Sequence, residues 1–415
     1  MSATNGNGHE PVIVGAARTP TGRLLGTLSS LPAHELGAIA IEAAVQRSGI
    51  DPTTIYEVLM GLVVGAGVGQ APARRAALGA GLPNNVGAAA INKVCGSGLK
   101  SVMIAANSIR AGEADVFVAG GMESMTHAPH LVMGARQGYK YGNAALEDSV
   151  LHDGLWCSFQ DWAMGRGAEF IARQFEVTRE EMDEFALRSH ERAAQATAAG
   201  RFVDEIVPVT IKGRKGSVTV LRDEGVRASY DDQGGYTLET SLAQLAKLPP
   251  AFEKDGSVTA GNAPGLNDGA AALVVTSRAE AARQGLQPLA RIVGFTHAAV
   301  EPQWIFAAPA QAIPRLLKRL DWSLDDVDLI ELNEAFAAQA LANGIDMQRQ
   351  GLNWQWDKVN VNGGAIALGH PIGASGARVL VTLLHALRQR DLKRGIAALC
   401  LGGGEAVALA VELEN

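Results

Sequence analysis

Cysteine and aromatic residues are scarce in this sequence, and long apolar or basic runs do not occur. The 415 residues include only 3 cysteines, at positions 95, 157 and 400, an odd number that cannot form a complete disulfide framework. No two of these cysteines have the spacing of a zinc site and the 9 histidines are scattered, so we expect no metal. Without an apolar run of about 18 residues, we expect no membrane-spanning helix.

The charge balance is mildly acidic. The sequence has 36 Lys and Arg against 43 Asp and Glu, a net charge of −7, which argues against nucleic acid or an anionic membrane as the partner. We therefore expect a small-molecule substrate, reduced thiols and a cytoplasmic location. The polar residues 1–10 are expected to form a disordered tail and not a leader sequence.

Apolar segments alternate with helical segments, which predicts an α/β fold with buried sheets. A strand over 12–20 is followed by a helix over 34–50 and a strand over 57–64. A helix that begins at Cys95 is followed by a strand over 115–123. The order is typical of sheets covered by helices.

The same order of segments returns roughly 280 residues later, which indicates an internal duplication. In the closest overlay, GSGLKSV (96–102) matches ASGARVL (374–380), and FVAGGME (117–123) matches LCLGGGE (399–405). Glycine clusters alone usually mark turns. Their recurrence in register favours a duplication instead.

Between the repeats, the composition changes. Residues 127–250 carry clustered aromatic, methionine and charged residues and end in a Pro-Pro pair. We predict an inserted loop domain over 127–250. The first half of the core then comprises 11–126 and 251–285, and the second half comprises 286–415.

Two chemically capable residues lie at corresponding positions in the two halves. Cys95 stands in NKVCGSGLKS, ahead of a helix whose unpaired N–H groups and dipole favour a thiolate. His370 stands in GHPIGASGAR, at the leading end of the equivalent helix, so facing halves would bring the two together. Taken singly, Cys95 can equally be a buried apolar thiol and His370 a satisfied loop residue.

Two more candidates lie at predicted strand ends in the second half. Cys400 stands in CLGGGE, where the glycines let backbone N–H groups approach a substrate oxygen. Asn333 stands in LNEAFAAQALA. Core filling by Cys400 and helix capping by Asn333 are the alternative roles. Because open sheets bind ligands at such ends, the four residues together predict an active site.

Five motifs in this chain, namely NKVCGSGLKS, GGMESM, NEAFA, GHPIGASGAR and CLGGGE, occur in the order typical of the thiolases. The chain resembles that family from residue 11 to its end. The resemblance implies a layered α-β-α-β-α core of two similar halves, an inserted loop domain that helps hold coenzyme A, and a homodimer or homotetramer. It also implies reversible thiolytic cleavage of 3-ketoacyl-CoA and Claisen condensation of acyl-CoAs, with acyl-CoA and CoA as substrates and no further cofactor.

The resemblance implies a role for each candidate. Cys95 would be the nucleophile that carries the acyl group as a thioester, and His370 would accept its proton. Cys400 would move the proton at C2 of the second substrate. One substrate oxygen would contact His370 and a water held by Asn333, and the other would contact the backbone N–H groups of Cys95 and Gly402.

The resemblance also implies a pocket for the acyl and pantetheine groups. Leu155, Met164, Ala335 and Phe336 occupy positions that line it. Because these residues are apolar, we expect them to contact the uncharged part of the substrate.

Three substrate-binding positions depart from the family pattern. Ala163 stands where biosynthetic members commonly carry histidine, Pro264 replaces a serine that touches the coenzyme, and Gln244 stands where serine is usual. We expect a wider acyl pocket and weaker coenzyme contacts.

Other functions fit part of the pattern. A ketoacyl synthase would need a second histidine where Asn333 stands. An NAD-dependent enzyme is disfavoured because GAGVG (65–69) does not fit G-x-G-x-x-G. A non-catalytic acyl-CoA-binding protein would explain the altered coenzyme contacts, but retention of the four catalytic-type residues argues against it.

Overall fold

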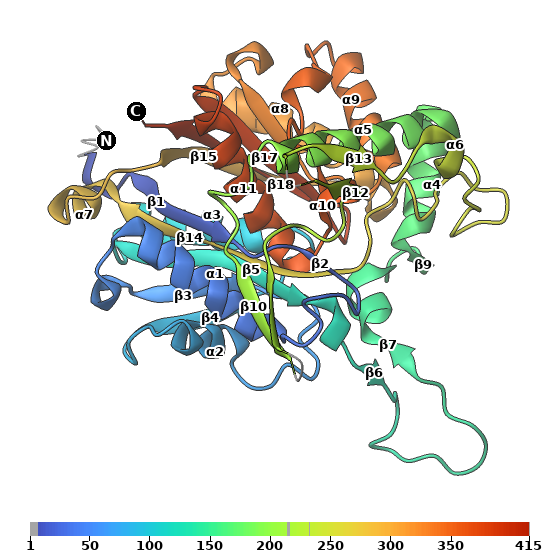
Figure 1. Cartoon of the computed structure of the whole chain (residues 1–415), viewed down its shortest axis with the longest axis horizontal. Coiled ribbons are helices and arrows are strands. Elements are labelled where there is room, and N and C mark those ends of the chain that lie inside the picture. The colour runs from blue at the N-terminus through green and yellow to red at the C-terminus, as the bar shows by residue number, and fades with distance from the viewer. Residues whose placement is uncertain (1–6, 214–215, 232, 415) are drawn as a thin grey trace.

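The computed structural model describes residues 7–213, 216–231 and 233–414. Residues 1–6 of the predicted tail lie outside this range; Asn7–His9 form a short 3-10 turn, and strand β1 (Pro11–Arg18) follows. The earlier and later parts of the chain form two neighbouring α/β units (Figure 1). None of the described helices is long and apolar enough to cross a membrane.

The sheet of the first half is built around a strand that comes late in the chain. Its order is β1, β14 (Asn267–Ser277), β5 (Val116–Ser124), β3 (Glu57–Gly61) and β4 (Gly87–Ile91), with β2 (Gly22–Arg23) also paired to β14. β14 runs antiparallel to both β1 and β5, whereas β3, β4 and β5 are parallel. Every residue of β1, β5 and β14 is buried, as expected for strands covered on both faces.

The second half repeats this order. Its strands are β15 (Ala290–Ala299), β18 (Glu405–Leu413), β17 (Arg394–Leu401) and β16 (Leu329–Leu332). β18 is antiparallel to both neighbours, and β16 is parallel to β17, as in the first half. The halves join where β1 pairs with β15, through Val12 with Arg291 and Ile13 with Ala290. The repeated order and directions agree with the inferred duplication. The overlay of FVAGGME on LCLGGGE is wrong in detail, because it sets Glu123 of β5 on Glu405 of β18, whereas the counterpart of β5 is β17.

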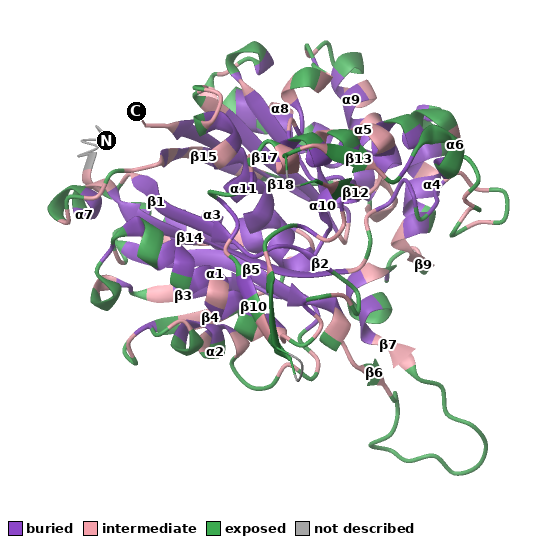
Figure 2. Ribbon diagram, viewed as in Figure 1, coloured by how far each residue is buried: buried purple, intermediate pink, exposed green. Residues whose placement is uncertain are grey.

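Helices form three layers around the two halves of this continuous ten-stranded sheet. The outer helices of the first half are α1 (Ala33–Ser48) and α2 (Pro72–Gly79), the central helices are α3 (Ser97–Ala111) and α11 (Ile372–Arg388), and the outer helices of the second half are α8 (Pro309–Leu320) and α9 (Ala337–Arg349). α3 and α11 pack against each other and share one core with both sheets. Separate cores lie beneath the outer helices. The result is the α-β-α-β-α order expected from the resemblance, with its central strands and helices buried (Figure 2).

The inserted segment adds helices and hairpins. The helices are α4 (Met164–Phe175), α5 (Arg179–Ala198) and α6 (Leu242–Leu245), and the hairpins are β6 (His130–Leu131) with β7 (Glu147–Asp148), β8 (Trp156–Cys157) with β9 (Trp162–Ala163), β10 (Val209–Gly213) with β11 (Gly216–Val220), and β12 (Ala228–Tyr230) with β13 (Tyr236–Leu238). α4 and α5 pack on α9, and α5 also packs on the short helix α10 (Ala365–Leu368). Outside this segment, a short helix, α7 (Arg278–Arg283), follows β14.

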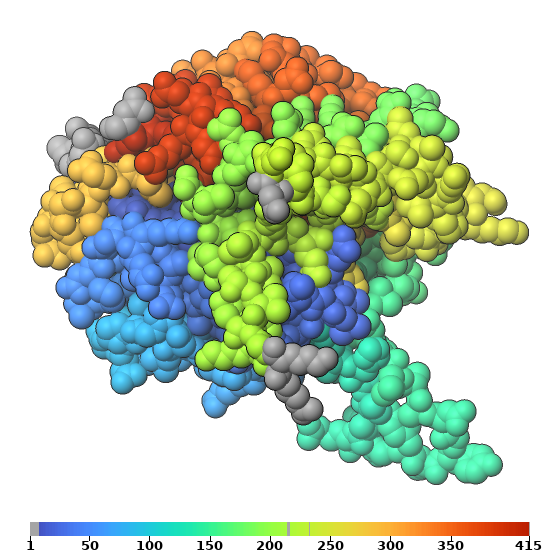
Figure 3. All heavy atoms as spheres, viewed as in Figure 1, coloured from blue at the N-terminus to red at the C-terminus, as the bar shows by residue number. Residues whose placement is uncertain are grey.

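A buried ion-pair cluster ties this segment to the first sheet. Arg18 at the end of β1 lies 2.6 Å from both Glu205 and Asp223, and all three side chains are almost completely buried. Residues 201–213 and 216–220 lie across the first half on the face seen in Figure 3. Removing one partner of such a cluster leaves an uncompensated buried charge, so the cluster fixes this attachment.

Both central helices begin at residues other than those predicted. α3 begins at Ser97 with Gly96 as its N-cap, so Cys95 precedes the helix. α11 begins at Ile372, so Ser375 lies in its first turn. Its N-cap is Pro371, whose φ of −69° already suits entry into a helix.

Glycines let the leading end of α11 lie directly against the first sheet. A Cβ on Gly121 of β5 would lie 2.1 Å from the carbonyl oxygen of Gly373, and one on Gly61 of β3 would lie 2.5 Å from it. Any side chain at either position would push the helix away. These glycines therefore set how deeply His370, just ahead of α11, enters the molecule.

Candidate active site

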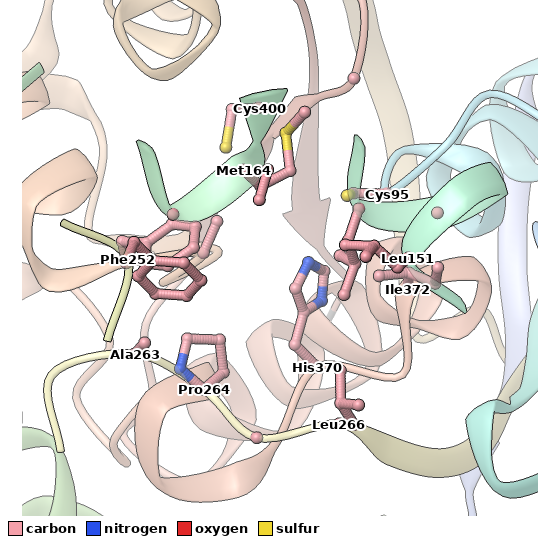
Figure 4. Close-up of a pocket in the computed structure, with 18 of the residues that line it drawn as sticks. Cys95, Leu151, Met164, Phe252, Ala263, Pro264, Leu266, His370, Ile372 and Cys400 are labelled. Carbon is pink, nitrogen blue, oxygen red and sulfur yellow. The ribbon is translucent and has the colours of Figure 1, made fainter. Parts of the chain in front are cut away.

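The leading ends of α3 and α11 meet at a cavity of about 340 Å³. Cys95 from the first half and His370 and Cys400 from the second half face the same space (Figure 4). The volume and largely apolar wall are typical of small-molecule sites. Among the described residues, no group of three or more His, Cys, Asp or Glu is arranged to hold a metal. The predicted site residues that line the cavity are Cys95, Leu155, Ala163, Met164, Pro264, Ala335, Phe336, His370, Cys400 and Gly402.

A strained turn presents Cys95 to the cavity. Val94, just before it, has φ of +46°, a left-handed conformation that β-branched residues rarely adopt. The Val94 N–H donates to Asn92 Oδ1 at 3.0 Å, and Ser97 Oγ donates to the Val94 carbonyl at 2.6 Å. Such a conformation costs about 1–3 kcal/mol and persists only where its surroundings hold it. The strain therefore distinguishes the turn that carries Cys95, and no local sequence pattern predicted it.

The surroundings of the Cys95 thiol favour its protonated form. Burial raises its pKa, and the backbone N–H groups of Cys95 and Gly402 oppose that effect without overcoming it. Helix-end electrostatics, which were expected to favour the thiolate, therefore act against this burial from a distance, because α3 begins two residues after the partly exposed Cys95. Cys95 needs a proton acceptor in order to react.

His370 is held in one tautomer by Ser375. The Nδ1 atom of His370 lies 2.6 Å from Ser375 Oγ, and that hydroxyl donates to the Pro371 carbonyl at 3.0 Å. Because the Ser375 hydroxyl donates its only hydrogen to the Pro371 carbonyl, it can only accept a hydrogen bond from His370. We therefore assign the ring proton to Nδ1, which leaves Nε2 as an acceptor. Burial, aided by the charge of Arg378, lowers the pKa of His370 to about 3, so the ring is neutral at physiological pH.

Asn333 lies beside His370. It follows β16, and its Nδ2 is 3.4 Å from His370 Nε2. Its backbone N–H donates to the Ala398 carbonyl at 3.0 Å, which ties the residue to β17. The N-cap of α9 is Phe336, so the alternative role of Asn333 as an N-cap is wrong.

Cys400 contributes a second neutral thiol. It lies in β17 opposite Ala406 of β18 and is 1% exposed. Burial raises its pKa well above the ordinary value, and the proximity of Cys95 adds to the rise. A thiol of this kind stays protonated until a strong base forms next to it. Two residues further on, Gly402 approaches the nucleophile turn so closely that a Cβ would lie 3.1 Å from Val94.

Apolar side chains enclose the rest of the cavity. Ala163 is the N-cap of α4 and Met164 is its first residue. The Phe336 ring meets those of Phe306 and Phe252 edge to face, with centroids 5.3 and 6.2 Å apart. Sequence reasoning missed Phe252 and Phe306, whose only signal was aromatic character in a chain with 5% aromatic residues.

Pro264 and Gln244, which both depart from the family pattern, lie in different environments. Pro264 lines the cavity (Figure 4). Gln244 does not: it is exposed on α6, where its side-chain oxygen accepts from Ser241 Oγ at 3.2 Å. Ser241 also caps the backbone N–H of Gln244 at 3.3 Å. In this structure Gln244 thus makes helix-capping contacts outside the cavity.

A buried carboxyl group supports the cavity from behind. Glu123 at the end of β5 accepts from the N–H groups of Val63, Val64 and Gly373 at 3.0, 3.2 and 2.9 Å. Burial raises its pKa to about 7, although these donors oppose the rise. The GGMESM motif contains Glu123, but nothing local in the sequence showed which loops the side chain would hold.

A cysteine thiol and a neutral histidine that border one cavity are typical of enzymes that form thioesters. The sequence matches the N-terminal domain of thiolase over residues 11–279 and the C-terminal domain of thiolase over residues 286–413. The chain belongs to the thiolase family.

Close relatives match nearly the whole chain. The acetyl-CoA acetyltransferase of Cupriavidus necator is 52% identical over 402 residues, covering 97% of this chain and 98% of its own. That of Paracoccus denitrificans is 51% identical over 401 residues, covering 97% and 98%. The crystal structure of the Bacillus anthracis acetyl-CoA acetyltransferase has a TM-score of 0.91 at 44% identity, covering 98% of this chain and 99% of that one. The structure of the Syntrophomonas wolfei acetyl-CoA acetyltransferase has a TM-score of 0.93 at 41% identity, with the same coverage.

Proposed function

We propose that this thiolase transfers acyl groups between coenzyme A thioesters through Cys95. In one direction CoA cleaves a 3-ketoacyl-CoA, and in the other direction two acyl-CoA molecules condense. The observation that carries the proposal is the cavity bordered by Cys95, His370 and Cys400 from both halves. The relatives named acetyl-CoA acetyltransferase support acetyl-CoA as one of the substrates.

The cleavage begins with two neutral groups. Cys95 Sγ attacks the C3 keto carbon, and its proton passes to Nε2 of His370. The C2–C3 bond then breaks, and its electron pair remains on C2. The Cys400 thiol gives its proton to C2, which releases acetyl-CoA, while Cys95 retains the shortened acyl group as a thioester. The high pKa of Cys400 supports this role, because its proton stays in place until the carbanion forms.

The second step restores every group. The sulfur of an incoming CoA attacks the thioester, and its proton passes to the Cys400 sulfur. Cys95 leaves as a thiolate and recovers the proton from His370. Condensation follows the same steps in reverse, and the covalent intermediate predicts ping-pong kinetics.

Backbone N–H groups stabilise the charge that develops on oxygen. The backbone N–H groups of Cys95 and Gly402 both point at the Cys95 sulfur. This placement supports their donating hydrogen bonds to the carbonyl oxygen of an acyl group bound to that sulfur. His370, together with a water held by Asn333, donates hydrogen bonds to the other substrate oxygen. The distance of 3.4 Å between Asn333 Nδ2 and His370 Nε2 supports this assignment.

Apolar side chains of the cavity wall contact the uncharged parts of the substrate. Leu155, Met164 and Phe336 contact the acyl and pantetheine groups, with Ala335 beside them. The inserted domain over 127–250 helps hold coenzyme A. Pro264 offers no hydroxyl to the coenzyme, and Ala163 leaves room for acyl groups longer than that of acetoacetyl-CoA.

The decisive assay follows the absorbance of the magnesium enolate of 3-ketoacyl-CoA. We expect a CoA-dependent loss of this absorbance with purified protein, for at least one substrate of a C4 to C8 series. No loss for any chain length, together with no acylation of Cys95 by acetyl-CoA, would refute the enzymatic proposal. Acyl-CoA binding without turnover would favour the non-catalytic alternative instead.

The proposal extends to assembly and location. Self-association as a homodimer or homotetramer is supported by large apolar side chains left exposed between β6 and β7, including Tyr139, Tyr141 and Leu146. A cytoplasmic location is supported by the three free cysteines. Light scattering on the purified chain measures the first, and fractionation of the source cells measures the second.

A further inference from the structure

An ion pair ties the strained nucleophile turn to the other half of the molecule. Lys93 Nζ pairs with a carboxylate oxygen of Glu405, which is 312 residues further along the chain. The two side chains are 23% and 30% exposed. Glu405 is the first residue of β18 and directly follows the glycine turn that begins at Gly402. The pair therefore joins the turn that carries Cys95 to the turn that carries Gly402.

A second carboxyl group, that of Glu123, connects the first half to the central helix of the second half. Glu123, in the first half, accepts from the N–H of Gly373 at 2.9 Å and from the N–H of Val63 at 3.0 Å. Gly373 is the second residue of α11 and lies three residues after His370. Glu123 thus holds the leading end of the second half's central helix.

The two contacts share one arrangement although the duplication does not relate them. Glu123 lies in β5, whose counterpart in the second half is β17, whereas Glu405 begins β18, the counterpart of β14. Each carboxyl group nevertheless reaches from its own half to the segment at the leading end of the other half's central helix.

Building on the proposed function, we propose that Glu405 and Glu123 are positioning residues that act across the two halves. Neither lines the cavity. Glu405, through Lys93, fixes the turn that presents Cys95, and Glu123, through Gly373, fixes the loop that carries His370. Together they bring a nucleophile and a base from different halves to reacting distance.

Two properties separate this role from simple stabilisation. The left-handed Val94 persists only while its surroundings hold it, so loss of the Lys93–Glu405 pair lets the turn relax and moves Cys95. A misplacement on the order of 1 Å can slow a reaction about a hundredfold. A partly exposed ion pair contributes little to global stability. Breaking the pair should therefore lower the reaction rate much more than it lowers the melting temperature.

The test measures single-turnover acetylation of Cys95 by acetyl-CoA, followed by rapid quench and mass spectrometry. We expect Glu405→Gln and Lys93→Met each to slow loading by about tenfold or more, with little change in the acetyl-CoA concentration for half-maximal rate. The charge-swapped double variant, Lys93→Glu with Glu405→Lys, should recover most of the wild-type rate. The matched control is Glu412→Gln, on the same strand and paired with Arg291, which should load as wild type does.

The outcomes distinguish this inference from the proposed function. If the wild-type chain gains no acetyl group, the proposed function fails. If the wild type loads and both single variants load at the same rate, or if the charge swap stays as slow as the single variants, the positioning role is refuted.

Glu123→Gln tests the second positioning residue. It keeps an acceptor oxygen but turns an amide N–H toward a backbone donor, so we expect slower loading at an unchanged half-saturating concentration. A folded Glu123→Gln variant that loads at the wild-type rate would contradict the positioning role of Glu123. If this buried substitution prevents folding, the charge swap at Lys93 and Glu405 still decides the role of Glu405.

Discussion

Replacing Ser375 with alanine removes the hydroxyl that accepts the Nδ1 proton of His370. Ser375 is completely buried and His370 is 6% exposed, so water cannot readily take its place. An unsatisfied buried donor costs about 1–3 kcal/mol. The ring can avoid that cost by rotating or by moving its proton to Nε2, and either change removes the acceptor that faces Cys95. With about 1.4 kcal/mol per factor of ten, the expected fall in kcat is about 5-fold to 150-fold.

The thiolysis assay measures this effect directly. Ser375 does not line the cavity, so KM should change little while kcat falls. Ser101→Ala is the matched control, because Ser101 is a buried serine of α3 that donates to the Ser97 carbonyl at 3.0 Å. It should leave kcat unaltered. A correctly folded Ser375→Ala enzyme with kcat within about twofold of wild type would show that the serine does not set the tautomer.

Three further substitutions probe the proposed chemistry. Cys95→Ser should abolish acetylation and turnover in a folded protein; mass spectrometry that finds the wild-type acetyl group on Cys157 instead would contradict this. Cys400→Ala should still acquire acetyl at Cys95 from acetyl-CoA, more slowly because CoA then leaves without the Cys400 proton, while losing cleavage of 3-ketoacyl-CoA; loss of both in a folded variant would point to a structural role. Each buried CH₂ of a longer acyl chain contributes about 0.8 kcal/mol, so Ala163→His should lower kcat/KM for C6 and C8 substrates more than for C4. Equal losses at all lengths, or a wild type confined to C4, would disprove the wider pocket.

The duplicated core was predictable because GSGLKSV and ASGARVL recur at the same place in the two halves. Gly98 and Gly376 show the physical reason: a Cβ on Gly98 would lie 2.7 Å from the backbone nitrogen of Ala377, and one on Gly376 would lie 2.3 Å from that of Leu99, so the packing of α3 against α11 excludes a side chain at either position. The exact beginning of α11 was less predictable. Pro371 serves as its N-cap, and the sequence alone suggested a start near Ser375, three residues too late.

The site was predictable only for residues with distinctive chemistry. A cysteine and a histidine at equivalent helix ends indicated a reaction, but the burial that protonates Cys95 is a property of the assembled halves. Ser375 and Glu123 were missed because their importance lies in contacts across the fold. Gln244 shows the opposite case, since matching a family position did not bring its side chain to the cavity.

The position of β14 between β1 and β5 affects how the chain folds during synthesis. β1 and β5 are completed by residue 124, but their shared partner ends at residue 277 of 415, when about two thirds of the chain has been made. Until then, both strands expose unpaired edges, which are sites for aggregation. Contacts between residues so distant in sequence also form slowly. The half of the molecule that leaves the ribosome first therefore completes its sheet late, and a chaperone that shields those edges during translation would protect it.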